Sequence, residues 1–163
     1  MSLESVRIRR ATDKDLVRIN LIEQESYRTS PYPKELLEKL LSDNNESFLV
    51  AEDKFNGIVG YCVSTSERQT AHLISIAVLP AHRRKGAGTR LMTTLVQYLR
   101  GKRIESLWLE VDQRNEDAIR LYKKLGFTKI MLLENYYSDG SDAVRMRMGL
   151  KKNASNSSSR VTE

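Results

Sequence analysis

A short segment rich in cations and glycines is the part of the sequence whose residue types most clearly predict chemistry. It reads Arg83-Arg84-Lys85-Gly86-Ala87-Gly88-Thr89 and stands between an apolar stretch and a segment with helical apolar spacing. A helix N-terminus offers unpaired N–H groups and the positive end of the helix dipole. Glycines let the main chain approach an anion closely, and flanking cations add charge. The segment therefore predicts a site for a diphosphate-bearing ligand.

This segment differs from the two common nucleotide-binding loops. A Walker loop ends in Gly-Lys-Ser/Thr, and the dinucleotide fingerprint has a third glycine where this sequence has Leu91. Glycines near a helix start often serve only the turn. The three consecutive cations before Gly86 are what favour a ligand here.

Apolar periodicity predicts the elements that must position this loop. We expect strands over residues 6–9, 48–52, 58–65, 71–79, 104–111, 127–133 and 144–150. Helices are expected after Thr12, after Pro33, after the glycine loop and from Asn115 to a stop at Gly126. The resulting order, β-α-α-β-β-β-α-β-α-β-β, predicts an α/β fold with a mixed sheet and helices on both faces.

Turn and cap residues support these boundaries. Thr12 with Asp15 is a capping-box pattern, and Asn56-Gly57 is a strong hairpin signal. The stretch 71–79 is almost continuously apolar, so we expect a central strand with both faces covered.

Composition bounds the remaining possibilities. The chain has 163 residues, of which 29% are charged and 40% hydrophobic, which predicts one soluble domain over 1–150 and a disordered polar tail over 151–163. Its apolar runs are too short for a membrane, it shows no signal peptide, and its one cysteine excludes an internal disulfide, so we expect a cytoplasmic protein. The net charge of +6 suits an anionic ligand or the ribosome, but interleaved charges and few aromatic residues argue against sequence-specific nucleic-acid binding.

Several of these segments together resemble the GCN5-related N-acetyltransferase superfamily. Arg83, Gly86 and Gly88 match its Arg/Gln-x-x-Gly-x-Gly/Ala signature, and the strand 75–80 matches the strand before it. The stretch from Leu109-Glu110-Val111 to Leu125-Gly126-Phe127 matches the motif after it. Within the superfamily the chain is most similar to protein N-terminal acetyltransferases of the ribosomal-protein-alanine (RimI) and archaeal types. The hairpin 136–143 and the strand 71–76 carry that similarity.

The resemblance implies acetyl-coenzyme A as co-substrate. It implies that the strands 71–79 and 104–111 splay apart, and that main-chain groups of residues 76–78 pair with the pantetheine like an added strand. The Val78 N–H would face the thioester oxygen. The implied coenzyme contacts are Ile76, Ala77, Val78, Arg83, Arg84, Lys85, Gly86, Ala87, Gly88, Thr89, Asn115, Ala118 and Tyr122.

The resemblance also implies an acceptor groove between the loop after the first helix and the hairpin 136–143. Archaeal relatives carry a glutamate in that loop where this sequence has Arg28, whereas Glu23 fits the acidic position of the other subfamily. Paired tyrosines in a hairpin can also simply cover a sheet edge. The implied acceptor residues are Glu23, Tyr27, Pro31, Tyr32, Tyr136 and Tyr137.

Direct transfer of an acetyl group from a thioester to an amine requires a base that deprotonates the amine, a hydrogen-bond donor that stabilises the oxyanion and an acid that protonates the departing thiolate. Presenting a neutral amine at pH 7 costs about 1.3 kcal/mol for an α-amine and about 4.6 kcal/mol for a lysine, so a weak base acting through water suffices for an N-terminus. We expect Glu110 as that base, His72 as its helper through a water, and Tyr122 as the acid. For His72 and Tyr122, packing alone is the competing interpretation.

Two other functions fit the same residues. The acceptor could be a lysine, a polyamine or another small amine, although the tyrosine hairpin argues against an open site. Alternatively, the chain could be an inactive coenzyme-binding or ribosome-associated module. A metal is not expected, because the pair His72 and Glu110 offers too few ligands.

Overall fold

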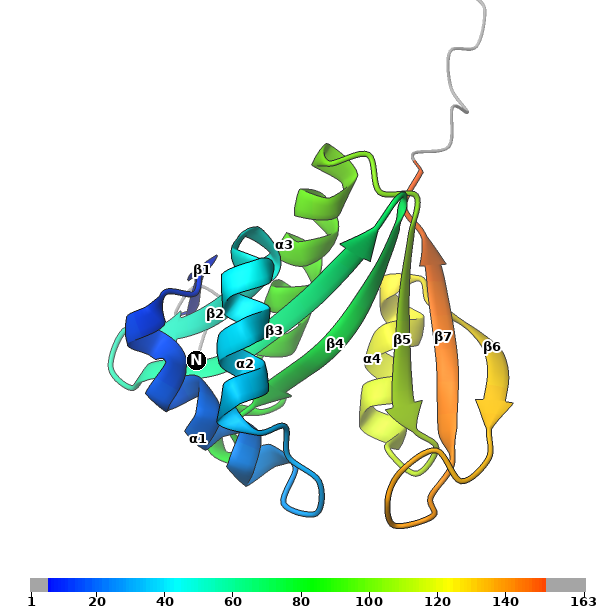
Figure 1. Cartoon of the computed structure of the whole chain (residues 1–163), viewed down its shortest axis with the longest axis horizontal. Helices are drawn as coiled ribbons and strands as arrows, with labels where there is room; N and C mark the ends of the chain where they lie inside the picture. The colour runs from blue at the N-terminus through cyan, green and yellow to red at the C-terminus, as the bar shows by residue number, and fades with distance from the viewer. Residues whose placement is uncertain (1–5, 152–163) are drawn as a thin grey trace, which may run out of the picture.

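The chain folds around a seven-stranded sheet, which the computed structural model describes over residues 6–151 (Figure 1). Its strands are β1 (Val6–Arg10), β2 (Phe48–Asp53), β3 (Gly57–Glu67), β4 (Thr70–Val78), β5 (Ser106–Asp112), β6 (Thr128–Leu133) and β7 (Ala143–Gly149). Their order is β1-β2-β3-β4-β5-β7-β6, with β4 and β5 parallel and the other neighbours antiparallel. The predicted mixed sheet is confirmed. Except for Lys151, the predicted polar tail lies outside the described residues.

Helices cover both faces of the sheet, as predicted. α1 (Leu16–Ser26) and α2 (Lys34–Asp43) lie in front in Figure 1, and α3 (Ala87–Gly101) and α4 (Glu116–Leu125) lie behind. Short 3₁₀ helices are η2 (Asp13–Asp15), η3 (Asn45–Ser47) and η4 (Pro80–His82). Each face has its own core: one is formed with α1 and α2, and the other with α3, α4 and the C-terminal strands. Within the described residues, no helix is both long and apolar enough to cross a membrane.

Local side-chain chemistry explains where these elements begin and end. The Thr12 N–H donates to the Asp15 carboxylate at 2.8 Å, which is half of the predicted capping box. At the β2–β3 turn, Asp53 Oδ1 accepts the main-chain N–H groups of two turn residues, and Gly57 takes a φ of +70°. α4 ends at Gly126, whose φ of +107° is the left-handed conformation typical of helix ends.

The gap between β4 and β5 is the feature of the fold that matters most for function. The two strands pair only at their starts, where Thr70 lies opposite Ser106 and His72 opposite Trp108. Beyond that row β5 continues beside β7 and β4 continues beside β3, so the two halves of the sheet diverge. β4 is central and helices cover both its faces, as predicted: its side chains join the core formed with α1 and α2 on one face and the core formed with α3 and α4 on the other. The divergence of β5 instead leaves the main-chain edge of β4 after His72 without a parallel neighbour.

Candidate active site

The β4 edge that faces the gap presents main-chain groups to a ligand. The Leu79 N–H donates to Val59 O on β3 at 2.8 Å, so Leu79 and Ala77 face β3 and the alternate residues face the gap. Two side chains donate to this edge: the Tyr27 hydroxyl to Ile76 O at 2.5 Å, and Arg83 Nε to Val78 O at 2.8 Å. Ile76 and Val78 therefore have the orientation expected for strand-like pairing, whereas Ala77 is turned the other way.

The loop before α3 has the geometry of an anion cradle. Gly86 is the N-cap of this fifteen-residue helix, with a φ of +91° that a side chain would strain. Arg83, Arg84 and Lys85 are exposed beside it. Unpaired N–H groups of the first helical turn and these cations suit a phosphate.

An ion pair joins this loop region to the N-terminus of α4. Arg84 forms an ion pair with Asp117 in the first turn of α4 at 2.7 Å, so its guanidinium is partly engaged. Asn115 caps the same helix, accepting the Ala118 N–H at 3.2 Å, as the sequence predicted. The implied coenzyme contacts of α3 and α4 thus flank the same side of the gap.

A histidine and a carboxylate meet where the strands begin to diverge. His72 Nε2 lies 2.5 Å from Glu110 Oε2, and Arg145 Nε donates to Glu110 Oε1 at 3.0 Å. Burial raises the Glu110 pKa, but His72 and Arg145 outweigh it, so the net pKa is lowered and the group is ionised at neutral pH. An ionised carboxylate only accepts hydrogen bonds, so His72 Nε2 is the donor in this bond, and in a neutral imidazole Nδ1 would be the acceptor.

The two partners differ in access. The Glu110 side chain is 9% exposed, whereas that of His72 is 42% exposed. An open hollow of about 420 Å³ begins at His72 and is lined by Thr65, Glu67, Arg68, Thr70, Ala71 and His72. The hollow therefore lies beside the β3–β4 turn, and the imidazole is the more accessible of the two groups from solvent.

Arg145 is a site residue that sequence reasoning missed. It lies directly opposite Glu110 in the β5–β7 register, and its guanidinium also sits over the Trp108 ring at 5.8 Å. Opposite charges across neighbouring strands stabilise each other. The alternating sequence of β7 predicts which face Arg145 occupies, but finding its partner requires the strand register.

Tyr122 is buried at the gap. It is 5% exposed, and its ring packs edge-on against Phe127 with centroids 5.7 Å apart. Burial, with smaller contributions from Tyr27 and Cys62, raises its pKa well above the usual value. Its hydroxyl therefore stays protonated and can serve as a hydrogen-bond donor. The packing expected of Tyr122 is therefore present, and its role as an acid stays a prediction.

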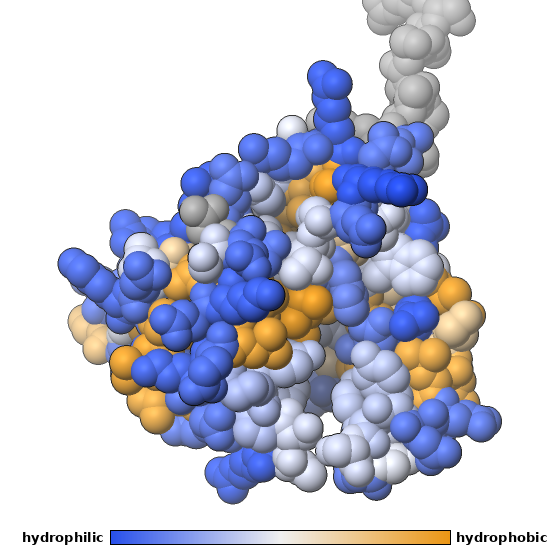
Figure 2. All heavy atoms as spheres, viewed as in Figure 1, coloured by the Kyte–Doolittle hydropathy of each residue, from blue (hydrophilic) through white to orange (hydrophobic). Residues whose placement is uncertain are grey.

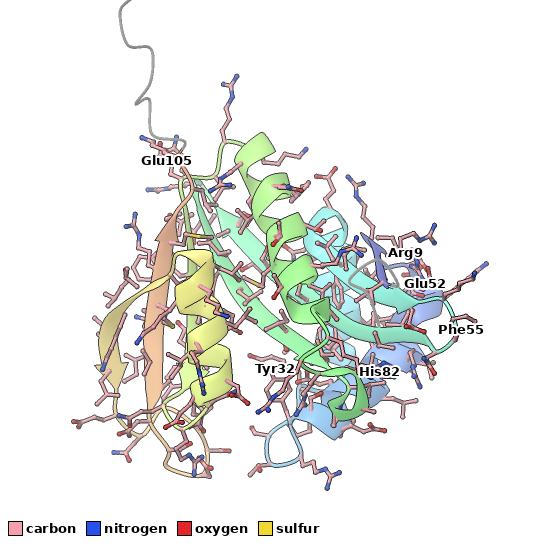
Figure 3. All side chains as sticks on the ribbon, turned by 180° about the vertical axis from the view of Figure 1, so that it is seen from behind. Arg9, Tyr32, Glu52, Phe55, His82 and Glu105 are labelled. Carbon is pink, nitrogen blue, oxygen red and sulfur yellow. The ribbon has the colours of Figure 1, made fainter. Side chains whose placement is uncertain are left out.

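Two loops face each other across the gap on the opposite side of the sheet. Tyr136 and Tyr137, between β6 and β7, stack edge to face with centroids 5.0 Å apart. Burial raises the Tyr32 pKa, with a smaller effect of Tyr136, and the Tyr32 hydroxyl donates to Ile74 O of β4 at 3.4 Å. Half-buried Pro31 precedes Tyr32 in the α1–α2 loop. Figure 2 shows a notch between these two halves of the surface, and in Figure 3 Tyr32 is visible between them from behind.

The β6–β7 loop is tied to the turn after β5. Arg114 pairs with Asp112 at 2.8 Å and reaches Asp139 at 3.4 Å. The Gln113 N–H donates to Asp142 O at 3.0 Å. These contacts orient the paired tyrosines over the gap.

Glu23 lies beneath the α1–α2 loop rather than on its surface. It is 1% exposed and accepts the Tyr32 N–H at 2.8 Å. The structure thus brings Glu23 to the predicted acceptor region but does not place it in the groove. The apolar spacing of α1 places position 23, one turn after Ile19, on the buried face, but a glutamate there is usually solvated.

Comparison with known proteins agrees with this arrangement. Residues 14–127 match the model of the acetyltransferase (GNAT) family. An N-alpha-acetyltransferase of Sulfurisphaera tokodaii is 34% identical, with 86% of this chain and 90% of that protein covered. The crystal structure of Ard1 from Thermoplasma volcanium has a TM-score of 0.85 and 34% identity, covering 91% of this chain and 99% of the other. That of the ribosomal-protein-S18-alanine N-acetyltransferase from Escherichia coli has a TM-score of 0.80 and 28% identity, covering 93% and 97%. The chain belongs to the acetyltransferase (GNAT) family, which uses acetyl-coenzyme A.

Proposed function

We propose that this acetyltransferase transfers the acetyl group of acetyl-coenzyme A to the N-terminal α-amine of a protein or peptide. The observation that carries the proposal is the His72–Glu110 pair at the start of the β4–β5 gap, faced by tyrosine-bearing loops on the acceptor side. Relatives named as N-alpha-acetyltransferases support the same acceptor class. The single cysteine, Cys62, is free and buried, which suits action in the reducing cytoplasm.

The coenzyme would bind on the α3–α4 side. Gly86 to Thr89 at the start of α3 would hold the diphosphate, with Arg83, Arg84 and Lys85 adding positive charge. The gap-facing main chain of Ile76 and Val78 would pair with the pantetheine amides, and this pairing would replace the Tyr27 and Arg83 contacts. When bound, the coenzyme supplies the thioester that donates the acetyl group.

On the acceptor side, the site residues must remove a proton from the attacking amine and stabilise the charges that form during the transfer. One amine proton would pass, directly or through a water, to His72 Nδ1, and the Glu110 carboxylate would stabilise the imidazolium. The N–C bond forms as the C–S bond breaks, and the Tyr122 hydroxyl would donate to the departing sulfur. The Val78 N–H faces the gap and is available to the carbonyl oxygen. Glu110 thus acts mainly through His72, because its lowered pKa makes it a weak base itself.

Tyr122→Phe should lower kcat by about 10- to 100-fold, because a hydrogen bond to a charged group contributes ~1.5–3 kcal/mol. The acetyl-coenzyme A dissociation constant should change little, since the ring and its packing on Phe127 remain. Steady-state rates with both substrates saturating, together with calorimetry, measure the two effects. Tyr98→Phe removes a hydroxyl that bonds Glu46 on the outer side of α3 and should leave kcat unchanged. An unchanged kcat in Tyr122→Phe would refute its donor role.

Acceptor class is tested with peptides of defined ends. The first set consists of lysine-free peptides with free N-termini, among them the N-termini of ribosomal proteins. The second set has the same peptides with a blocked N-terminus and an added internal lysine, and the third set consists of polyamines. We expect acetylation of the free N-termini alone, detected by mass spectrometry. Labelling only of blocked peptides or polyamines would overturn the proposed acceptor. Coenzyme binding without any transfer would instead identify an inactive binding module.

A further inference from the structure

Glu23 is a buried carboxylate that the proposed chemistry does not use. Among residues 6–151 its side-chain partners are uncharged donors: the Tyr61 hydroxyl, the Tyr32 N–H at 2.8 Å and the Ser75 hydroxyl at 3.4 Å. Burial, followed by the charge of Glu23, raises the Tyr61 pKa well above its usual value. A buried charge without a cation is costly, so its hydrogen bonds must compensate for lost hydration.

These bonds connect the α1–α2 loop to the edge of the gap. The Glu23 side chain holds the Tyr32 N–H, and its main-chain oxygen accepts the Tyr27 N–H at 2.9 Å. The carboxylate also contacts Ser75 of β4, between two residues whose carbonyls accept the tyrosine hydroxyls of the loop. The Glu23 side chain thus ties the Tyr32 end of the segment 27–32 to β4, whereas the Tyr27 bond is the main-chain bond of the last turn of α1, which any residue at position 23 would accept.

We propose that Glu23 is a positioning residue that sets the width of the acceptor groove and thereby the choice of the acceptor's first residue. The identity of the acceptor in this inference rests on the proposed function, whereas the contacts between Glu23 and the α1–α2 loop do not depend on it. Tyr27 and Tyr32 border the groove, and Tyr32 cannot move relative to β4 without breaking the bond between its N–H and the Glu23 carboxylate, which also contacts Ser75 of β4. Glu23 acts through these tyrosines, since its side chain is shielded from solvent.

Glu23→Gln keeps the shape and an oxygen for the Tyr32 N–H but removes the charge that strengthens the bonds. We expect the acceptor KM to rise about 10-fold and the preference among first residues to flatten, with kcat and acetyl-coenzyme A affinity nearly unchanged. Glu23→Ala removes the anchor and should raise KM further, about 100-fold. Tyr61→Phe leaves the loop contact intact but removes one donor, so its KM should lie between wild type and Glu23→Gln.

The matched control is Glu25→Gln, which makes the same charge change on an exposed position of α1. It should match wild type in every measurement. Peptides differing only in the first residue are compared by kcat/KM, with thermal unfolding recorded for each variant. If Glu23→Ala does not fold, Glu23→Gln and Tyr61→Phe still decide the question.

An unchanged KM and unchanged selectivity in Glu23→Gln would overturn the inference. So would an equal loss of kcat, coenzyme affinity and thermal stability, because that pattern indicates general damage. Failure of the proposed function shows itself separately, in wild-type protein that does not acetylate N-termini. In that case the same variants are measured with the amine that the wild-type protein does acetylate. If the wild-type protein acetylates no amine, the variants are compared by their affinity for acetyl-coenzyme A alone. An effect of Glu23→Gln on that affinity would again overturn the inference.

Discussion

Gly86→Glu should weaken the binding of acetyl-coenzyme A by about 100-fold, equivalent to ~2.8 kcal/mol. Gly86 has a φ of +91°, a conformation that strains any other residue by ~1–3 kcal/mol. The new carboxylate would also stand at the positive end of α3, beside Arg83 and Lys85, where the proposal places the diphosphate. Titration calorimetry with acetyl-coenzyme A measures the change.

The control for backbone strain and added charge is Gly57→Glu. Gly57 has a φ of +70° in the β2–β3 turn, and a Cβ there would meet no atom within 4 Å. This variant should bind the coenzyme like wild type. If a folded Gly86→Glu protein kept wild-type affinity, the start of α3 would not be the diphosphate site.

Glu110→Gln should lower kcat on the order of 100-fold while coenzyme binding survives. The amide preserves the shape, but it cannot stabilise a protonated His72, and Arg145 loses its counter-charge. Glu105→Gln makes the same substitution at the far end of the sheet, as Figure 3 shows, and should retain wild-type rates. Steady-state kinetics on a free-N-terminal peptide measures both variants.

Two further measurements separate a joint role from independent ones. If Glu110 acts through His72, His72→Ala combined with Glu110→Gln should cost no more than the larger single effect. The Glu110 pKa is lowered below its ordinary value of 4.5, so this carboxylate contributes stability at higher pH and loses it only as the pH falls through the lowered pKa. If the reaction rate falls as the pH is lowered from about 8 to about 6, the protonation of a group other than Glu110 must cause that fall. Additive losses in the double variant would contradict the shared role.

Periodicity and turn chemistry predicted nearly the whole fold, because most elements bury a stripe that their own sequence displays; the edge strand β6, which is largely exposed, is an exception. Thr12, Gly57 and Gly126 marked boundaries that hydrogen bonds and positive φ angles confirm. The apolar composition of 71–79 indicated a covered central strand, which the structure confirms, but only the family resemblance implied that β5 turns away after His72.

The site was less predictable wherever it depends on register or tertiary burial. The sequence suggested His72 and Glu110 through a family resemblance, but neither their contact nor Arg145 follows from spacing. Glu23 is the clearest example, because a glutamate on an amphipathic helix is usually solvated. Its burial results from Tyr61 and Ser75, which reach it from strands far along the chain.

The division of the protein into two cores has a practical consequence for engineering. The α1–α2 layer packs on one face of the sheet and the α3–α4 layer on the other, so their side chains meet few common neighbours. Changes confined to distant, unshared contacts tend to combine additively. A library randomised only at 28–31, which keeps the bonds of Tyr27 and Tyr32 to β4, could therefore be screened for new amines against an unaltered donor-binding half, with the sheet separating the two.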